Sequence, residues 1–305
     1  MQITKEQFDI MTTILEYKEM DTNLTQRYLS ENLGISLGKA NKVMSELFNL
    51  KIIELDSFKN YAITSYGLEL LEPYKVKRAI FIAAGFGSRL VPITLNTPKP
   101  LVRVKGKRII ETLLDAVVDV GIKEIYIVRG YLKNQFDELL IKYPNIKFYD
   151  NDEFNISNNI TSLNLVKDKI CNSYILDSDL YLTNPKLIRK YEYSTHYLGI
   201  STDRSDDWCL KLKNGKITSM ELGGLNSPLM VGISFWTKDD GIKLAYDIDE
   251  VLKTPGGKEK YWDEVALSIK QNKYQIGVRL VKDTDIVEID TFNDLRIIDE
   301  VYNNM

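Results

Sequence analysis

This sequence of 305 residues has little histidine and little cysteine: one histidine, His196, and two cysteines, Cys171 and Cys209. A single histidine excludes most histidine-based metal sites and argues against a Ser-His-Asp triad, which would have to use that one residue. The two cysteines form neither a disulfide framework nor a metal-ligand pattern. We therefore expect two reduced thiols in a cytoplasmic protein.

The sequence also lacks a long apolar run and a charge excess. No stretch approaches the roughly 18 residues of a membrane span, and the first residues, MQITKEQFDIM, are charged where a signal peptide would be apolar. The formal net charge is −3, which argues against a general coat for nucleic acid. With 44% hydrophobic residues, the chain is long enough for two domains, and we expect no membrane contact.

The first part of the chain, residues 1–74, is predicted to be a small helical domain. Residues 23–53 indicate two helices broken at residues 34–36, where Ser36 can cap the second helix. Two short β-rich runs around a polar turn and a further helix follow within residues 52–71. This order resembles a winged helix-turn-helix domain of the MarR type.

The charge of this domain bears on its partner. Residues 1–75 contain seven lysines and one arginine against eleven acidic residues, a net charge of −3. A DNA reader needs clustered positive charge to replace phosphate counterions, and Lys39 and Lys42 on the expected recognition helix supply little of it. We therefore favour a protein partner, a regulatory role or a homo-oligomer contact over DNA binding, which stays open.

After a linker at residues 71–77 the pattern changes. Apolar, strand-like runs alternate with amphipathic helical runs, as in AIFIAAG, RIIETLLDAVVDVG and EIYIVRG. Strands separated by helices predict right-handed βαβ units. Over residues 77–305 the sequence thus predicts an α/β, Rossmann-like domain with a mixed, mainly parallel sheet.

A glycine loop opens this second domain in the stretch AIFIAAGFGSRLVPITLNTPKP, residues 79–100. It lacks the spacing of a Walker A loop and the third glycine of the dinucleotide fingerprint. Its glycines still let backbone N–H groups approach an anion, and its arginine and lysine add fixed positive charge. The alternative interpretation is a plain strand-to-helix turn with exposed charges.

The segments AAGFGSRLVPIT and TPKPL resemble the signature of nucleotidyltransferases that join a nucleoside triphosphate to a phosphate monoester. The resemblance covers residues 77–305. It implies that the glycine loop embraces the nucleotide phosphates and that Arg89 and Lys99 act as catalytic residues that steady the triphosphate. The loop residues that it assigns to the nucleotide are Ala83, Ala84, Gly85, Gly87 and Ser88.

Aspartates follow two of the expected strands. YILDSDLY carries Asp177 and Asp179, and DIVEIDT carries Asp290. The resemblance implies that Asp179 and Asp290 hold Mg²⁺, a hard cation that prefers oxygen ligands, with Asp177 in the nucleotide site. A solvated turn is the alternative for the Asp-x-Asp pair. The chemistry needs no protein nucleophile, because a phosphate with a second pKa near 6 is largely dianionic at pH 7.

An amide-rich segment, residues 155–167, offers contacts to a base or ribose through Asn158, Asn159 and Ser162. Amide clusters are also common in plain turns, so both interpretations stay open. The order Asn-Asn-x-x-Ser-Leu resembles the bacterial choline-phosphate cytidylyltransferases, which use CTP. Pro98-Lys99 stands where some of that group have His-Lys, and most of its members lack a leading winged helix.

Two segments with tryptophan beside acidic residues suggest the acceptor. A quaternary ammonium is recognised by aromatic faces, with carboxylates adding attraction. DRSDDWCLKL and EKYWDEVA resemble the choline pocket of that subfamily, and the residues carried over are Trp208, Tyr261, Trp262 and Asp263. The alternative is that these tryptophans are packing residues.

The resemblance therefore implies an enzyme that converts CTP and phosphocholine to CDP-choline and pyrophosphate. The same reaction with phosphoethanolamine, 2-aminoethylphosphonate or a sugar 1-phosphate is the near alternative. A winged-helix transcription regulator with a nucleotide-sensing domain is the alternative of another class.

Overall fold

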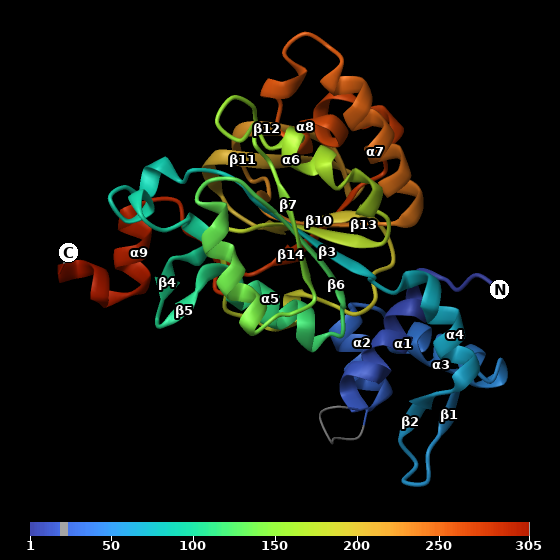
Figure 1. Ribbon diagram of the computed structural model, residues 1–305. Helices are drawn as coiled ribbons and strands as arrows, with labels where there is room; N and C mark the ends of the chain where they lie inside the picture. The colour runs from blue at the N-terminus through green and yellow to red at the C-terminus, as the bar shows by residue number, and fades with distance from the viewer. Residues whose placement is uncertain (19–23, 305) are drawn as a thin grey trace. The chain divides into compact units, whose positions relative to one another are not determined.

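The computed structural model describes residues 1–18 and 24–304. Asn23, where the expected helix-turn-helix stretch begins, and Met305, the last residue of the expected second domain, lie outside these ranges. Within them the chain forms two compact units, Met1–Lys75 and Val76–Met305 (Figure 1). The division falls in the segment 71–77 that the sequence suggests as a linker. The roles assigned to the two domains stay predictions.

The smaller unit contains helices and one β-hairpin in the order that the sequence predicts. Thr25 caps the start of one helix, where its hydroxyl accepts a hydrogen bond from the N–H of Tyr28. Ser36 caps the next helix in the same way. Gly34, with φ +63°, ends the helix between them. Its elements are α1 Lys5–Lys18, α2 Gln26–Leu33, α3 Leu37–Asn49, β1 Ile53–Leu55, β2 Tyr61–Ile63 and α4 Ser65–Leu71. Their assignment to the winged-helix class stays a prediction.

Among the described residues of the larger unit, nine strands form one sheet in the order β10-β14-β12-β11-β13-β8-β3-β6-β7. The strands β8, β3, β6 and β7 at one side of the sheet are parallel, and β13 runs antiparallel to β8. The prediction of a mixed α/β sheet is therefore confirmed, but the expectation that it is mainly parallel is wrong: among the described strands of this sheet four pairings are parallel and five are antiparallel, because β11, β12 and β13 follow one another as antiparallel neighbours. The strands are β3 Arg78–Ala83, β6 Glu124–Arg129, β7 Ile146–Asp150, β8 Ser173–Asp177, β10 His196–Ile200, β11 Arg204–Lys213, β12 Lys216–Leu225, β13 Leu229–Trp236 and β14 Gly277–Val281.

Two short antiparallel ladders and several helices complete this unit. The helix α7 begins at Thr237, whose hydroxyl accepts from the N–H of Asp240, and α9 begins at a capping box of Thr291 and Asp294. No helix among the described residues is long and apolar enough to cross a membrane. The helices are α5 Ile109–Asp119, α6 Ile160–Leu165, α7 Lys238–Leu252, α8 Trp262–Glu264 and α9 Phe292–Ile298, and the ladders pair β4 Arg103–Val104 with β5 Lys107–Arg108 and β9 Leu180–Leu182 with β15 Ile286–Glu288.

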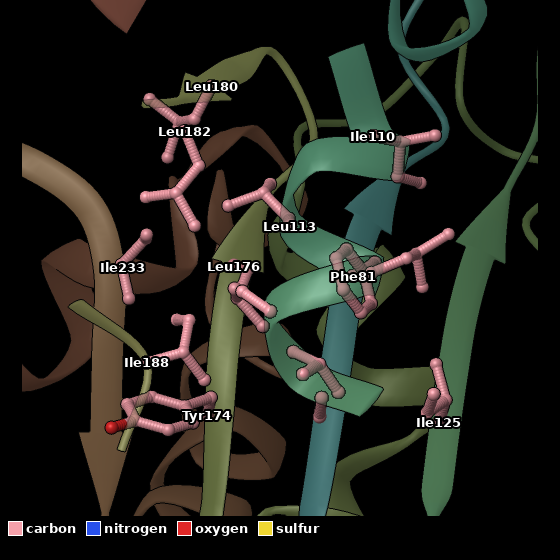
Figure 2. Close-up of a cluster of buried hydrophobic side chains, with 14 of the residues drawn as sticks. Phe81, Ile110, Leu113, Ile125, Tyr174, Leu176, Leu180, Leu182, Ile188 and Ile233 are labelled. Atoms are coloured by element: carbon pink, nitrogen blue, oxygen red, sulfur yellow. The ribbon is translucent and has the colours of Figure 1, made fainter. Parts of the chain in front are cut away.

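The core lies on both faces of the sheet because strand side chains alternate between its faces. Phe81 and Leu176 point to one face, where Leu113 of α5 packs on them (Figure 2). Ile80 and Ile175 point to the other face, toward α6, α7 and the π-helical turn Val265–Ile269. Figure 1 shows α5 on one side of the sheet and α6 and α7 on the other.

The chain order of the strands β3, β6, β7 and β8 creates a crevice. From β3 the chain moves outward through β6 and β7, and then returns to place β8 on the other side of β3. The connections from β3 and β8 therefore leave in opposite directions at their carboxyl ends, which is where α/β sheets bind ligands. The glycine loop follows β3, and Asp177 is the last residue of β8, with Asp179 two residues beyond.

Candidate active site

A cavity of about 670 Å³ opens at the carboxyl ends of β3 and β8. It brings together segments that lie far apart in the sequence, from the glycine loop to the C-terminal strand β15. As formed by the described residues, it is lined by all of the predicted site residues except Trp262. These are Ala83, Ala84, Gly85, Gly87, Ser88, Arg89, Lys99, Asn158, Asn159, Ser162, Asp177, Asp179, Trp208, Tyr261, Asp263 and Asp290.

The glycine loop packs tightly against the segment that carries Lys99. Gly87 has φ +68°, and a Cβ added there would lie 2.9 Å from the Cβ of Lys99. The hydroxyl of Thr94 donates a hydrogen bond to the Gly87 carbonyl at 2.9 Å. Only glycine combines this backbone conformation with such a close approach. Gly87 therefore fixes the distance between the loop and the lysine.

Tyr131, which follows β6, holds the same loop from outside. Its N–H donates to the carbonyl of Ala84 at 3.0 Å, and its hydroxyl donates to the carbonyl of Leu95 at 3.0 Å. Its ring meets that of Phe86 edge to face, with centroids 4.5 Å apart. These contacts restrain both ends of the loop. Sequence reasoning missed this tyrosine, because its contacts depend on the pairing of β3 with β6.

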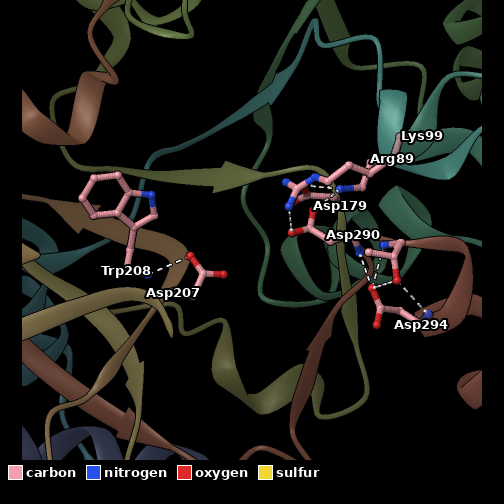
Figure 3. Close-up of polar contacts among 8 residues, drawn as sticks. Arg89, Lys99, Asp179, Asp207, Trp208, Asp290 and Asp294 are labelled. Atoms are coloured by element: carbon pink, nitrogen blue, oxygen red, sulfur yellow. Dashed lines mark hydrogen bonds and ion pairs between the residues drawn. The ribbon is translucent and has the colours of Figure 1, made fainter. Parts of the chain in front are cut away.

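Lys99 lies at the centre of the charged end of the cavity (Figure 3). Its Nζ donates to Asp179 Oδ2 at 2.8 Å and to Asp290 Oδ1 at 2.6 Å. Burial on its own lowers the pKa of this ammonium, but the two carboxylates outweigh burial and raise it. Arg89 lies beside them, with Nη1 3.0 Å from Asp290 Oδ2, while most of its side chain stays exposed. Lys99 is therefore a permanent positive charge at this end.

Three carboxylates lie close together beside Lys99. Asp179, Glu288 and Asp290 each place an oxygen within 4.8 Å of the others. Asp179 Oδ1 is buried and accepts no hydrogen bond from any described group, so it has a lone pair to offer a cation. Carboxylate oxygens are the ligands that Mg²⁺ prefers. The residues present thus fit a divalent cation.

Glu288 was not among the sequence candidates for the metal. It precedes Asp290 by two residues at the end of β15, which repeats the spacing of Asp177 and Asp179 at the end of β8. That repetition was the available signal. β15 pairs with β9, with Glu288 opposite Leu180, and this pairing carries the second acidic segment to the first.

Asp177 depends on a glycine in the neighbouring strand. A Cβ added to Gly232 of β13 would lie 2.1 Å from Asp177 Oδ2, so no larger residue fits while the carboxylate keeps its place. Burial, and then the negative charge of Asp179 and Asp263, raise the pKa of Asp177 well above its usual value. Sequence reasoning also missed Gly232, because its role follows from the register of β13 against β8.

The amide-rich segment lines the cavity, but some of its polar groups bond within the protein. The Ser162 hydroxyl accepts from Asn151 Nδ2 at 2.9 Å. Asn159 Oδ1 accepts from the N–H of Trp262 at 2.9 Å, and Asn158 Nδ2 donates to the carbonyl of Glu259 at 3.2 Å. Contacts of Asn158, Asn159 and Ser162 with a nucleotide stay predictions.

Aromatic and acidic side chains also line the cavity. The rings of Trp208 and Tyr261 lie edge to face, with centroids 6.1 Å apart. The ladder of β11 is irregular between Ser205 and Trp208, and such bulges redirect a side chain. Asp263 is buried, and this burial raises its carboxyl pKa to about 7 although the Tyr197 hydroxyl donates to it at 2.8 Å. In Figure 3 Trp208 and Asp207 are drawn apart from the Lys99 cluster.

Trp262 lies behind this wall. Its side chain is 3% exposed, and its ring stacks on that of Tyr197 with centroids 6.0 Å apart. It also contacts Trp236 edge to face, so it belongs to the core on that side of the sheet. The backbone turns into α8 at this point, which directs Tyr261 and Asp263 to the cavity and Trp262 inward. Its role as a binding face for the acceptor stays a prediction.

A glycine loop after the first strand, two cations and a cluster of carboxylates at a switch point of an α/β sheet define the site of a nucleotidyltransferase. Residues 78–185 match the model of the family described as Nucleotidyl transferase. The chain is also 34% identical over 230 residues to the choline-phosphate cytidylyltransferase of Streptococcus pneumoniae, which covers 74% of this chain and 99% of that protein. The chain belongs to the nucleotidyl transferase family, and the prediction of a nucleotidyltransferase enzyme is confirmed.

Two further comparisons agree with this assignment. The chain is 32% identical to the 2-aminoethylphosphonate cytidylyltransferase of Lancefieldella rimae, over 73% of this chain and 92% of that protein. The solved structure of the CTP:phosphocholine cytidylyltransferase from Streptococcus pneumoniae superposes with a TM-score of 0.68 at 33% identity, over 73% of this chain and 98% of that one. A UDP-glucose pyrophosphorylase complexed with UDP-glucose, at 15% identity and a TM-score of 0.59, shares the fold.

The Gly232→Ala variant tests the close approach of β13 to Asp177. The added methyl group would displace the carboxylate at a cost of about 1–3 kcal/mol for overpacking. If that cost appears in the transition state, we expect a roughly 5- to 150-fold loss of kcat/KM in pyrophosphate release, since about 1.4 kcal/mol is tenfold. Gly38→Ala in α3, where an added Cβ meets no described atom within 4 Å, is the control. Wild-type kcat/KM in Gly232→Ala would show that Asp177 needs no such space.

Proposed function

We propose that this protein is a cytidylyltransferase that joins CTP and phosphocholine to give CDP-choline and pyrophosphate. The observation that carries the proposal is that one cavity is lined both by Lys99 and its carboxylates and by Trp208, Tyr261 and Asp263, with Trp208 apart from the Lys99 cluster (Figure 3). An aromatic and acidic surface suits a quaternary ammonium, which has no N–H to donate. The names of the relatives in Streptococcus pneumoniae support the same acceptor.

The reaction follows from charge and alignment. A phosphate oxygen of phosphocholine attacks the α-phosphorus of CTP, a new P–O bond forms, and the bond to the bridging oxygen breaks so that pyrophosphate leaves. No proton has to be removed, because the attacking phosphate is largely dianionic at pH 7. The side chains of Arg89 and Lys99 neutralise and align the phosphates. His196 is buried away from the residues that line the described cavity, which agrees with a reaction that needs no histidine base.

Mg²⁺ is the cofactor that we propose for this site. Asp179 and Asp290 would hold it, with Glu288 as a third ligand. The cation would supply charge neutralisation for the triphosphate and the leaving pyrophosphate. The support comes from the oxygen donors, and from Asp179 Oδ1 in particular, which has no hydrogen-bond partner among the described groups.

A second acceptor has specific support. A relative at 32% identity is named for 2-aminoethylphosphonate, and a primary ammonium would also be attracted to Asp263. Phosphoethanolamine falls in the same class. A sugar 1-phosphate is less suited, because sugar hydroxyls need hydrogen-bonding groups where Trp208, Met220 and Met230 line the cavity. A transcription regulator that only senses a nucleotide is not favoured, because the chain keeps the charged groups of the reaction.

A matrix of substrates tests the proposed function. Pyrophosphate release is measured with Mg²⁺ for CTP, UTP, ATP and GTP against phosphocholine, phosphoethanolamine, 2-aminoethylphosphonate and glucose 1-phosphate. We expect the highest kcat/KM for CTP with phosphocholine. Asp179→Ala, which removes a proposed metal ligand, is the inactive control. The proposal is wrong if no amino-alcohol phosphate is turned over with any of the four nucleotides.

The Trp208→Ala variant tests the aromatic face. Loss of a cation–π contact worth about 0.5–2 kcal/mol should raise the KM for phosphocholine roughly tenfold and leave the KM for CTP within about twofold. Trp208→Phe keeps an aromatic ring and should show a smaller effect. An unchanged KM for phosphocholine in Trp208→Ala would mean that the acceptor binds elsewhere.

We further propose that residues 1–74 form a winged helix-turn-helix domain of the MarR type that contacts a protein partner or a second copy of the chain. Support comes from the order of α2, α3, the hairpin β1–β2 and α4, and from a net charge of −3 over residues 1–75. The second domain, residues 77–305, carries the reaction. A cytoplasmic location, which we also propose, agrees with cysteines that we expect to be reduced.

An electrophoretic DNA-shift assay at modest salt tests the preference against DNA. We expect no sequence-selective shift by the full-length protein, because acidic residues outnumber basic ones in residues 1–75. Sedimentation of the same sample reports whether it self-associates. Tight and sequence-selective binding would contradict this proposal and would leave the enzymatic one untouched.

A further inference from the structure

Two segments of the larger unit that both line the cavity contact each other directly. Residues 151–159 lead into α6 on the side that we assign to the nucleotide, and residues 257–263 carry the side chains that we assign to the acceptor. Asn159 lies at the point where they meet. The sequence suggests that this amide contacts the base or ribose, but its hydrogen bonds point to another role.

The side chain of Asn159 caps the start of α8. Its Oδ1 accepts from the N–H of Trp262 at 2.9 Å. Trp262 is the first residue of α8, and the first N–H groups of a helix have no partner within the helix. Because Trp262 is only 3% exposed, water is a poor substitute for this acceptor. The hydrogen bond thus satisfies a buried donor that would otherwise be unpaired.

Neighbouring contacts join the same two segments. The N–H of Asn158 donates to the carbonyl of Lys258 at 2.7 Å, and Asn158 Nδ2 donates to that of Glu259 at 3.2 Å. The ammonium of Lys258 pairs with Glu153 at 2.9 Å. These contacts reach the loop before α8, whereas Asn159 reaches the first turn of the helix itself.

The position of the Trp262 backbone determines where the side chains of Tyr261 and Asp263, its neighbours in the sequence, lie. Tyr261 and Asp263 line the cavity. The ring of Tyr261 contacts that of Trp208. The carboxylate of Asp263 accepts a hydrogen bond of 2.8 Å from the hydroxyl of Tyr197. A shift of the intervening peptide would therefore move an aromatic face and a carboxylate together. The Trp262 N–H is held from outside the turn by Asn159, while within the turn the N–H of Tyr261 donates to Glu264 Oε2 at 2.7 Å.

We infer that Asn159 is a positioning residue for the acceptor, which acts through the peptide of Trp262. This inference rests on the proposed function, because it assumes that Tyr261 and Asp263 bind the acceptor. It changes the sequence interpretation, in which Asn159 binds the nucleotide. The two roles differ in which KM the residue controls.

The test compares Asn159→Leu with Asn159→Asp in the full-length protein. Leucine removes the accepting oxygen, and aspartate keeps one. In pyrophosphate release we expect Asn159→Leu to raise the KM for phosphocholine roughly tenfold, the equivalent of about 1.4 kcal/mol, with the KM for CTP within about twofold. Asn159→Asp should stay within about threefold of wild type for both. Asn134→Leu, an exposed asparagine outside the cavity, is the matched control.

Hydrogen exchange separates this inference from the proposed function. In the ligand-free protein, Asn159→Leu should speed amide exchange in residues 260–264, and Asn159→Asp should leave it slow. A KM for CTP that rises as much as that for phosphocholine would overturn the inference, as would unchanged exchange. If wild-type protein does not turn over phosphocholine, the proposed function fails while the exchange measurement still decides whether Asn159 holds this wall.

Discussion

The charged part of the cavity depends on one buried ammonium group, that of Lys99. Lys99 holds Asp179, which follows β8, and Asp290, which follows β15. Without a cation between them these carboxylates would repel each other, and the pairing of β9 with β15 that brings them together would cost more. The same lysine packs on Gly87 of the glycine loop. Loop, lysine and carboxylates are therefore one unit, and a change in any of them alters the other two.

The ion pairs around Asp290 also provide partners for both cations. Arg89 and Lys99 both contact Asp290, so neither cation is left unpaired when the cavity contains no anion. A phosphate that enters competes with Asp290 for the same two cations. An exchange of partners costs less than desolvating a free lysine in an 11% exposed position would. The site can thus keep strong positive charge beside strong negative charge and remain stable.

The sequence predicts those features that are local. The glycine loop, Arg89 and Lys99 lie in one stretch of the chain, and Asp179 and Asp290 each follow a strand with a clear pattern. The parallel part of the sheet could be predicted because β3, β6, β7 and β8 alternate with helical segments, whereas β10 to β13 follow one another without a helix between them. Gly232 could not be predicted, since its role depends on which strand pairs with β8. Trp262 shows the same limit, because only the rotation at the start of α8 decides which ring faces the cavity.

The cavity is built from two kinds of structure. Lys99 and the carboxylates around it lie on strand ends and on a loop that β3, β6 and β8 fix. Trp208 and Tyr261, which we propose as acceptor residues, lie on the hairpin of β11 and β12 and in the segment 257–263, and loops and hairpins can change without disturbing the sheet. Relatives named for choline phosphate and for 2-aminoethylphosphonate are 34% and 32% identical to this chain. Identity over the matched residues therefore does not select the acceptor. We propose that the side chains around Trp208 and Tyr261 do, and that Asn159 holds the turn that carries Tyr261.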